Sequence, residues 1–122
     1  MASFNRVFLL GNVGQAPEIM YTLSGRAVAT LTVATDEKTK NEAGEYVKHT
    51  EWHRLVLCGK QAEVAAEYIV KGSHIHAEGR LQTRKYTDKN GVERSTTEVI
   101  AERFQLLDKR SDREPAKGGR LI

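Results

Sequence analysis

The stretch TEWHRLVLCGK, residues 50–60, carries the side chains best suited to chemistry in this 122-residue chain. It contains the only tryptophan, Trp52, beside His53, and the only cysteine, Cys58. A thiol and an imidazole can form a nucleophilic pair, whereas an aromatic ring beside a guanidinium can form a binding surface. The alternation of side chains along a strand separates these two interpretations.

A catalytic pair of Cys58 and His53 is not expected. The two residues are five positions apart, and an odd separation within a strand places side chains on opposite faces. The preceding residues, Leu55, Val56 and Leu57, are apolar surroundings that disfavour a thiolate. We therefore predict that Cys58 is an inert strand residue.

Other motifs for catalysis or metal binding are weak. His74 and His76 share one strand face, which allows a two-histidine metal site, but no second cluster with ligand spacing accompanies them. The sequence GNVGQ has too few glycines for a phosphate-binding loop or a dinucleotide fingerprint. No carboxylates show the pairing of an acid/base site. We expect no enzymatic activity, no bound metal and no cofactor.

Length and composition indicate one soluble domain. The formal charge of +3 is compatible with a polyanionic partner but does not require one. A single cysteine cannot form an internal disulfide, which favours a reducing cytoplasm. The sequence shows no signal peptide, and no apolar run approaches the roughly 20 residues that span a membrane.

Hydrophobic patterning predicts five strands and one helix. The strands are expected at residues 6–13, 26–35, 50–58, 74–88 and 92–107, and the helix at 60–73. Pro17 and the turn signal Ser24-Gly25 indicate a connection after the first strand. Residues 36–49 are charged and poor in apolar side chains, so they are predicted to form a long mobile loop. Gly72 is expected to end the helix, and Asn90-Gly91 predicts a hairpin.

This order is typical of an all-β domain with one helix, a five-stranded OB-fold Greek-key barrel with the helix between strands three and four. A strand-rich sandwich with one helix is the alternative. We expect the folded domain to span residues 1–107. Residues 108–122 are polar and are predicted to be a weakly structured tail.

Two strands are predicted to carry an aromatic ring and a cation on one face. Trp52 and Arg54 share a face of one strand, and Arg84 and Tyr86 share a face of another, with Lys85 adjacent. Such a face suits stacked nucleobases with phosphates held nearby. Trp52 could equally be a core residue, and protein-binding and oligosaccharide-binding barrels use the same fold. The pattern alone leaves these alternatives open.

The sequence resembles bacterial-type single-stranded DNA-binding proteins over nearly all of residues 4–107. The resembling stretches are NRVFLLGNVGQAPE, GRAVATLTVAT, TEWHRLVLCGKQAEVAAEY, KGSHIHAEGRLQTRKYTDKNG and STTEV. The resemblance implies an OB-fold that assembles as a homotetramer, binds single-stranded DNA without sequence preference and protects it during replication, repair and recombination. It implies no catalysis.

The resemblance also assigns residues. Trp52 and Tyr86 match two of the family's four aromatic positions, whereas the other two fall near Thr39 and at Cys58, which are not aromatic. Tyr21 and Tyr46 are candidate substitutes. Phosphate contacts are expected from six cations: Arg6, Arg54, Lys60, Lys71, Arg84 and Lys85. Subunit contacts are expected at His53 and His74.

Members of this family usually end in an acidic tip that recruits replication and repair proteins, whereas the sequence here ends KGGRLI. Either the sequence is shortened, or the protein is a plasmid, phage or specialised form that does not recruit partners in this way. The resemblance implies a bacterial, nucleoid-associated location without membrane contact. The alternative function is an OB-fold protein–protein adaptor of replication restart, in which Trp52 packs in an interface; a small Cys/His hydrolase is disfavoured by the strand geometry.

Overall fold

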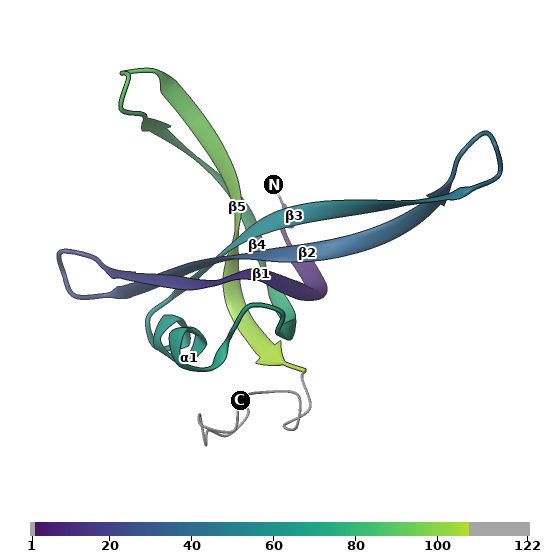
Figure 1. Cartoon of the computed structure of the whole chain (residues 1–122). Coiled ribbons are helices and arrows are strands. Elements are labelled where there is room, and N and C mark those ends of the chain that lie inside the picture. Colours follow the sequence, from purple (N-terminus) through teal and green to yellow (C-terminus); the bar gives the residue numbers. More distant parts are fainter. Residues whose placement is uncertain (1, 108–122) are drawn as a thin grey trace.

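Alternating side chains on five strands build a closed barrel, with one helix at one end (Figure 1). The computed structural model describes residues 2–107. The elements are β1 (Val7–Tyr21), β2 (Ala27–Lys40), β3 (Tyr46–Cys58), α1 (Lys60–Tyr68), β4 (His74–Thr87) and β5 (Glu93–Leu106). The predicted OB-fold barrel, with the helix between the third and fourth strands, is confirmed.

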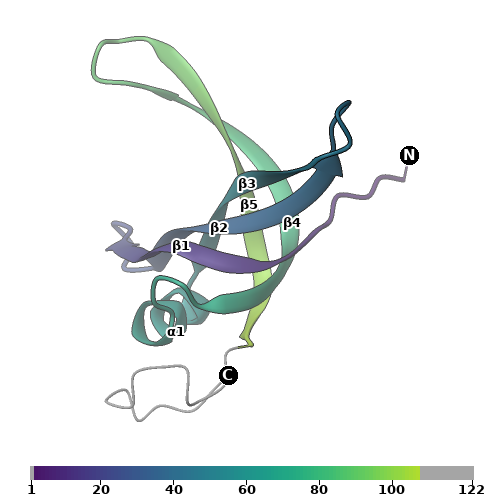
Figure 2. The ribbon, with the colours of Figure 1, turned by 45° about the vertical axis from the view of Figure 1, so that its right-hand side comes forward.

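The strands close in the order β1-β2-β3-β5-β4, and β4 pairs with β1 to complete the barrel. All neighbours are antiparallel except β3 and β5, which pair in parallel where Leu55 lies opposite Val99. The helix α1 packs against β1, β2 and β3 (Figure 2). Its buried residues are Ala62 and Ala65. The parallel pairing makes β5 a neighbour of both β3 and β4, so its side chains can contact residues of either strand.

The interior is built from apolar side chains that alternate with outward ones. In β2, Ala29, Leu31 and Val33 are at most 2% exposed, while the intervening residues are partly exposed. Leu55 and Leu57 from β3 and Ile75 from β4 complete the centre of the core and are fully buried. Burying a Leu or Ile side chain stabilises a fold by about 1.5–3 kcal/mol, so this interior is what holds the barrel closed.

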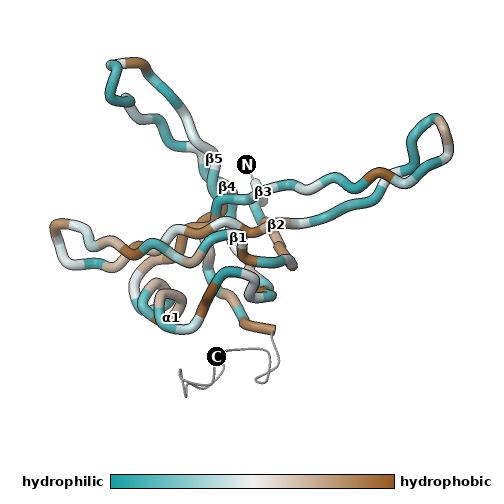
Figure 3. The backbone as a smooth tube through the Cα atoms, viewed as in Figure 1, coloured by the Kyte–Doolittle hydropathy of each residue, from teal (hydrophilic) through white to brown (hydrophobic). Residues whose placement is uncertain are grey.

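Three hairpins extend from the barrel as arms. The β2–β3 and β4–β5 arms are mostly hydrophilic along their length, whereas the β1–β2 arm is mixed and exposes Met20 and Leu23 (Figure 3). All three arms use the same turn. The carbonyl of its first residue accepts a hydrogen bond from the N–H of a glycine three positions later, and the first side chain accepts one from the N–H just after that glycine. The turns are residues 22–26, 41–45 and 88–92, with Gly25, Gly44 and Gly91 at φ values of 87°, 82° and 79°.

The prediction of a mobile loop at residues 36–49 is wrong. β2 continues to Lys40 and β3 begins at Tyr46, so the segment is a regular hairpin in which Asp36 lies opposite Thr50 and Lys40 opposite Tyr46. The arm has no apolar interior to bury, and therefore it lacks the hydrophobic alternation that would have predicted strands. Its sequence signal is the turn around Asn41 and Gly44.

The first strand is also longer than predicted. β1 runs through Pro17 to Tyr21, where the sequence indicated a connection. The pairing with β2 shifts register between Gln15 and Glu18, so that Pro17, which has no N–H to donate, lies at an irregularity of the ladder. Ser24-Gly25 is the turn, as predicted.

The helix is shorter than predicted. It ends at Tyr68, and Ile69 already has an extended conformation. Ile69 is nevertheless buried, so its apolar character reflects packing after the helix rather than a further helical turn. Gly72, predicted to end the helix, lies with φ 91° in the following turn, and its N–H donates to the carbonyl of Val13. The predicted hairpin at Asn90-Gly91 is confirmed, as a turn with positive φ at Gly91 only. The predicted tail, residues 108–122, lies outside the described residues.

Candidate nucleic-acid interface

Trp52 and Arg54 lie on the outward face of β3. Leu55 and Leu57 point into the barrel, so the alternation of the strand turns Trp52 and Arg54 outward, and 60% of the Trp52 surface is exposed. The ring lies against Gly14 of β1, where an added Cβ would overlap the indole. Trp52 is therefore a surface ring supported by backbone, not a core residue.

Arg84 and Tyr86 lie on the outward face of β4, within the arm that β4 forms with β5. Tyr86 is 42% exposed, and the Arg84 guanidinium carbon is 5.7 Å from the centre of its ring. Arg84 lies opposite Thr96, and Tyr86 opposite Arg94. A ring with a cation beside it is the arrangement that the sequence predicted for this strand.

A buried carboxylate joins the two strands. Glu98 of β5 is 3% exposed and accepts hydrogen bonds from Arg54 Nε at 2.7 Å and from Arg84 Nε at 3.1 Å. Glu98 is not among the residues predicted from the sequence. Its type and spacing gave no signal, because its two partners are 44 and 14 residues away in the chain and meet only through the strand order.

The electrostatics of this cluster favour the ionised carboxylate. Burial raises the pKa of Glu98, but the hydrogen bonds and charges of Arg54 and Arg84 outweigh it, and the net result is a pKa below the ordinary value. Glu98 is therefore an anion at neutral pH, and the three groups together carry one net positive charge. The outward side of the cluster is a shallow pocket of about 280 Å³ lined by Arg54, Arg84, Tyr86 and Thr96.

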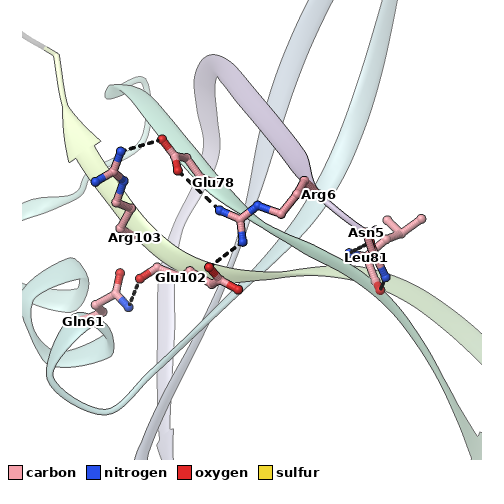
Figure 4. A network of polar contacts seen from close by, with 7 residues as sticks. All are labelled: Asn5, Arg6, Gln61, Glu78, Leu81, Glu102 and Arg103. Atoms are coloured by element: carbon pink, nitrogen blue, oxygen red, sulfur yellow. Dashed lines mark hydrogen bonds and ion pairs between the residues drawn. The ribbon is translucent and has the colours of Figure 1, made fainter. Parts of the chain in front are cut away.

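The other predicted phosphate contacts lie elsewhere. Arg6, just before β1, pairs with Glu102 of β5 and with Glu78 of β4, whose carboxylate also accepts a hydrogen bond from Arg103 (Figure 4). A phosphate at Arg6 would have to compete with these two carboxylates. Its predicted contact with phosphate stays a prediction.

The three lysines are exposed and dispersed. Lys60 is the first residue of α1 and lines an apolar groove with Val64 and Phe104. Lys71 lies in the turn after the helix. Lys85 is in the β4–β5 arm, but the alternation of β4 turns it to the face opposite Arg84 and Tyr86. Among the predicted cations, only Arg54 and Arg84 are joined by Glu98.

The two histidines expected at subunit contacts are both half-buried. His53 shares the inward side of β3 with Leu55, near the rim of the barrel, and its Nε2 lies 2.9 Å from the Thr35 hydroxyl. His74 begins β4, and its carbonyl accepts a hydrogen bond from the N–H of Leu107. By alternation, His53 lies on the face of β3 opposite Trp52. His74 pairs with Asn12, Asn12 with Ala34 and Ala34 with Trp52, so His74 lies on the same outward face as Trp52, three strands away. Their role at subunit contacts stays a prediction.

The structure also shows where Cys58 and Thr39 lie, the two residues at positions where the resemblance implies aromatic side chains. Cys58 is a free, half-buried thiol at the end of β3, and Thr39 is exposed in the β2–β3 arm opposite Val47. Tyr46 in the same arm is 71% exposed, and the Lys40 ammonium is 5.6 Å from its ring centre. Tyr21, at the end of β1, is 60% exposed. Both tyrosines thus offer ring surface to solvent, on two different arms.

Residues 2–107 contain no group of three or more His, Cys, Asp or Glu side chains arranged to hold a metal ion. Within the same residues, no helix has the length and apolar character required to cross a membrane. His76, which the sequence paired with His74 as potential ligands, lines a small pocket with Arg103, Phe104 and Gln105 instead.

The closed barrel, the position of the helix and the outward rings define an OB-fold barrel, a class that includes many oligonucleotide-binding domains. Residues 4–107 match the Single-strand binding protein family, and the chain belongs to this family. It is a DNA-binding family without catalytic activity.

The solved structures that are similar to the chain include two single-stranded DNA-binding proteins. A Plasmodium falciparum SSB in complex with single-stranded DNA has 30% sequence identity and a TM-score of 0.80, with 88% of this chain and 98% of that chain covered. A deletion mutant of the single-stranded DNA-binding protein from Thermus aquaticus has 34% identity and a TM-score of 0.77, with 88% and 52% covered. The chain thus spans about half the length of the second protein.

Proposed function

We propose that this protein binds single-stranded DNA without sequence preference and protects it during replication, repair and recombination, without catalysis. Bases stack on Trp52 and Tyr86, and Arg54 and Arg84 bind phosphates. The observation that carries this proposal is the pair of exposed rings on one side of the barrel, with two arginines fixed between them by Glu98. Family membership and the DNA complex of the Plasmodium relative support it.

The rings are expected to provide most of the affinity that is independent of salt. Stacking a base on an aromatic side chain is worth about 1–3 kcal/mol, and every base has a face to stack. Phosphate contacts add affinity because the protein's cations release counterions that are condensed on the DNA. This gain falls steeply as the salt concentration rises. Binding should therefore be strong at low salt and only partly lost at high salt.

Fluorescence of the single tryptophan tests the proposal. Titration with oligo-dT at two salt concentrations should quench Trp52, with weaker binding at the higher salt. Tyr86→Leu, which keeps apolar bulk but removes the ring, should weaken binding by about 1–3 kcal/mol, while the matched variant Tyr86→Phe should bind like the wild type. Absence of quenching at low salt would instead favour the protein–protein adaptor.

We further propose a homotetramer with His53 and His74 at subunit contacts, in a bacterial cytoplasm at the nucleoid. The exposed apolar side chains of Phe8 and Leu10 on β1 support self-association. An imidazole gains charge between about pH 8 and 5, so protonation at a contact should loosen the assembly. Light scattering at pH 7.5 and 5.5 tests this, and a mass that does not change when His53→Ala is introduced would remove His53 from the interface.

A further inference from the structure

Glu98 is the one acidic side chain that the structure buries on the proposed DNA-binding face of residues 2–107. Both carboxylate oxygens are used: Oε2 accepts from Arg54 Nε at 2.7 Å and from Arg84 Nη2 at 3.4 Å, and Oε1 accepts from Arg84 Nε at 3.1 Å. The two arginines are about half exposed, whereas the Glu98 side chain is 4% exposed. An acidic group beneath a polyanion-binding surface requires an explanation, because it lowers the positive charge available to phosphate.

The hydrogen bonds that hold Arg54 and Arg84 suggest an explanation for this buried acidic group. Arg54 uses its Nε edge, and its two Nη groups make no hydrogen bond to a described residue. Arg84 donates from Nε and Nη2 to the Glu98 carboxylate, so its Nη1 group remains to donate to a ligand. Each guanidinium is thus fixed from below while N–H groups remain for a ligand. A guanidinium presents its donors in a rigid fork, so fixing one edge also fixes the direction of the others.

We propose that Glu98 is a positioning residue for DNA binding, which holds Arg54 and Arg84 in the orientation that phosphates require before DNA arrives. The inference rests on the proposed function. β5 is the strand between β3 and β4, so a carboxylate on its outward face can reach an arginine on either side. Without it, two like charges would face each other, and two long side chains would have to be ordered when DNA binds.

Charge and positioning predict opposite effects for Glu98→Gln. Removing a negative charge beside phosphates should tighten binding if charge alone matters. If positioning dominates, the variant should bind oligo-dT roughly five- to thirtyfold more weakly, since the cost of immobilising two side chains then falls on the binding step. Glu93→Gln is the matched control, because Glu93 is an exposed residue of β5 without an ion pair to a described residue, and its replacement changes the net charge equally.

The experiment measures oligo-dT affinity by Trp52 fluorescence over a series of salt concentrations for the wild type and both variants. We expect Glu93→Gln to bind at least as tightly as the wild type. For Glu98→Gln we expect weaker binding and a salt dependence reduced by about one phosphate contact, which a purely structural role would not change. Binding by Glu98→Gln as tight as that of Glu93→Gln would overturn the inference.

Two further measurements address the case in which Glu98→Gln does not fold. Circular dichroism reports whether Glu98→Gln is folded. If it is not, Glu98→Asp decides, because it keeps the charge but withdraws the carboxylate from the arginines: weaker binding supports positioning, and wild-type binding contradicts it. The outcomes also separate the two proposals. If neither the wild type nor Glu93→Gln quenches Trp52 with oligo-dT, the proposed function fails; if both do and Glu98→Gln is unimpaired, only the role of Glu98 fails.

Discussion

The indole ring of Trp52 lies over Gly14, and the space that it occupies is the space that a side chain at Gly14 would fill. A Cβ at this position would overlap the ring atom Cζ3, and it would also lie 2.9 Å from the Thr32 hydroxyl oxygen and 3.2 Å from the ring atom Cε3. The glycine of β1 therefore fixes where the ring of β3 can lie. This relationship joins residues of β1 and β3, two strands that do not pair with each other.

Gly14→Ala should displace the Trp52 ring and weaken binding of single-stranded DNA. The loss should reach about 1 kcal/mol, part of the value of one stacked base. Fluorescence titration with oligo-dT measures it, and thermal unfolding reports any change in stability. The control is the same substitution in a Trp52→Ala background, measured with labelled DNA: an effect of equal size there would show that the glycine does not act through the ring.

Replacing Cys58 with phenylalanine should tighten DNA binding. Cys58 is half-buried and shares the outward face of β3 with Trp52 and Arg54 by alternation, so an aromatic ring there would add a stacking surface. We expect a gain of about 1 kcal/mol in oligo-dT affinity. Cys58→Ser is the control and should bind like the wild type. Complete loss of function in Cys58→Ser would restore the nucleophile that strand geometry argues against.

Gly44→Ala should destabilise the β2–β3 arm. Gly44 has a φ of 82°, a region that costs other residues roughly 1–2 kcal/mol. Hydrogen exchange of the ladder amides near Lys40 and Tyr46 should accelerate accordingly, since this arm can open without unfolding the barrel. Ala43→Gly in the same turn is the comparison and should have a smaller effect. Equal exchange in both variants and in the wild type would mean that residues 36–49 behave as the loop first expected.

Acid should destabilise the fold through three carboxylates. Arg103 lowers the pKa of Glu78, Arg94 lowers that of Asp88, and Arg54 with Arg84 overcomes burial to lower that of Glu98. Because each pKa is lower in the folded chain, the stabilisation is complete above the ordinary values of 4.5 for Glu and 3.8 for Asp and is lost as the pH falls below them.

Thermal unfolding between pH 7 and pH 3 measures this loss. Glu78→Gln should unfold at a lower temperature than the wild type at pH 7, and the difference should shrink as the pH falls and the wild-type carboxylate becomes protonated. Glu93→Gln, which has no ion pair to a described residue, should follow the wild-type curve. A constant difference between Glu78→Gln and the wild type at every pH would assign the effect to packing rather than to charge.

Much of the fold could be predicted from local patterns. The period-two alternation of β2 and of the end of β3 predicted the strands, because burial of one face leaves a direct imprint on the sequence. The prediction failed where no face is buried, as in the arm around Gly44, and where Pro17 interrupts a ladder that continues beyond it. Patterns report burial, and elements held by backbone pairing alone leave little trace.

The sequence by itself determined that Trp52 and Arg54 share one face of a strand and that Arg84 and Tyr86 share one face of another, because strand geometry is local. Only the tertiary structure decided that these faces are joined through Glu98 and that Trp52 lies on Gly14. Both contacts depend on which strands become neighbours when the barrel closes. That choice is made by the burial of the whole core, which no short stretch of sequence contains.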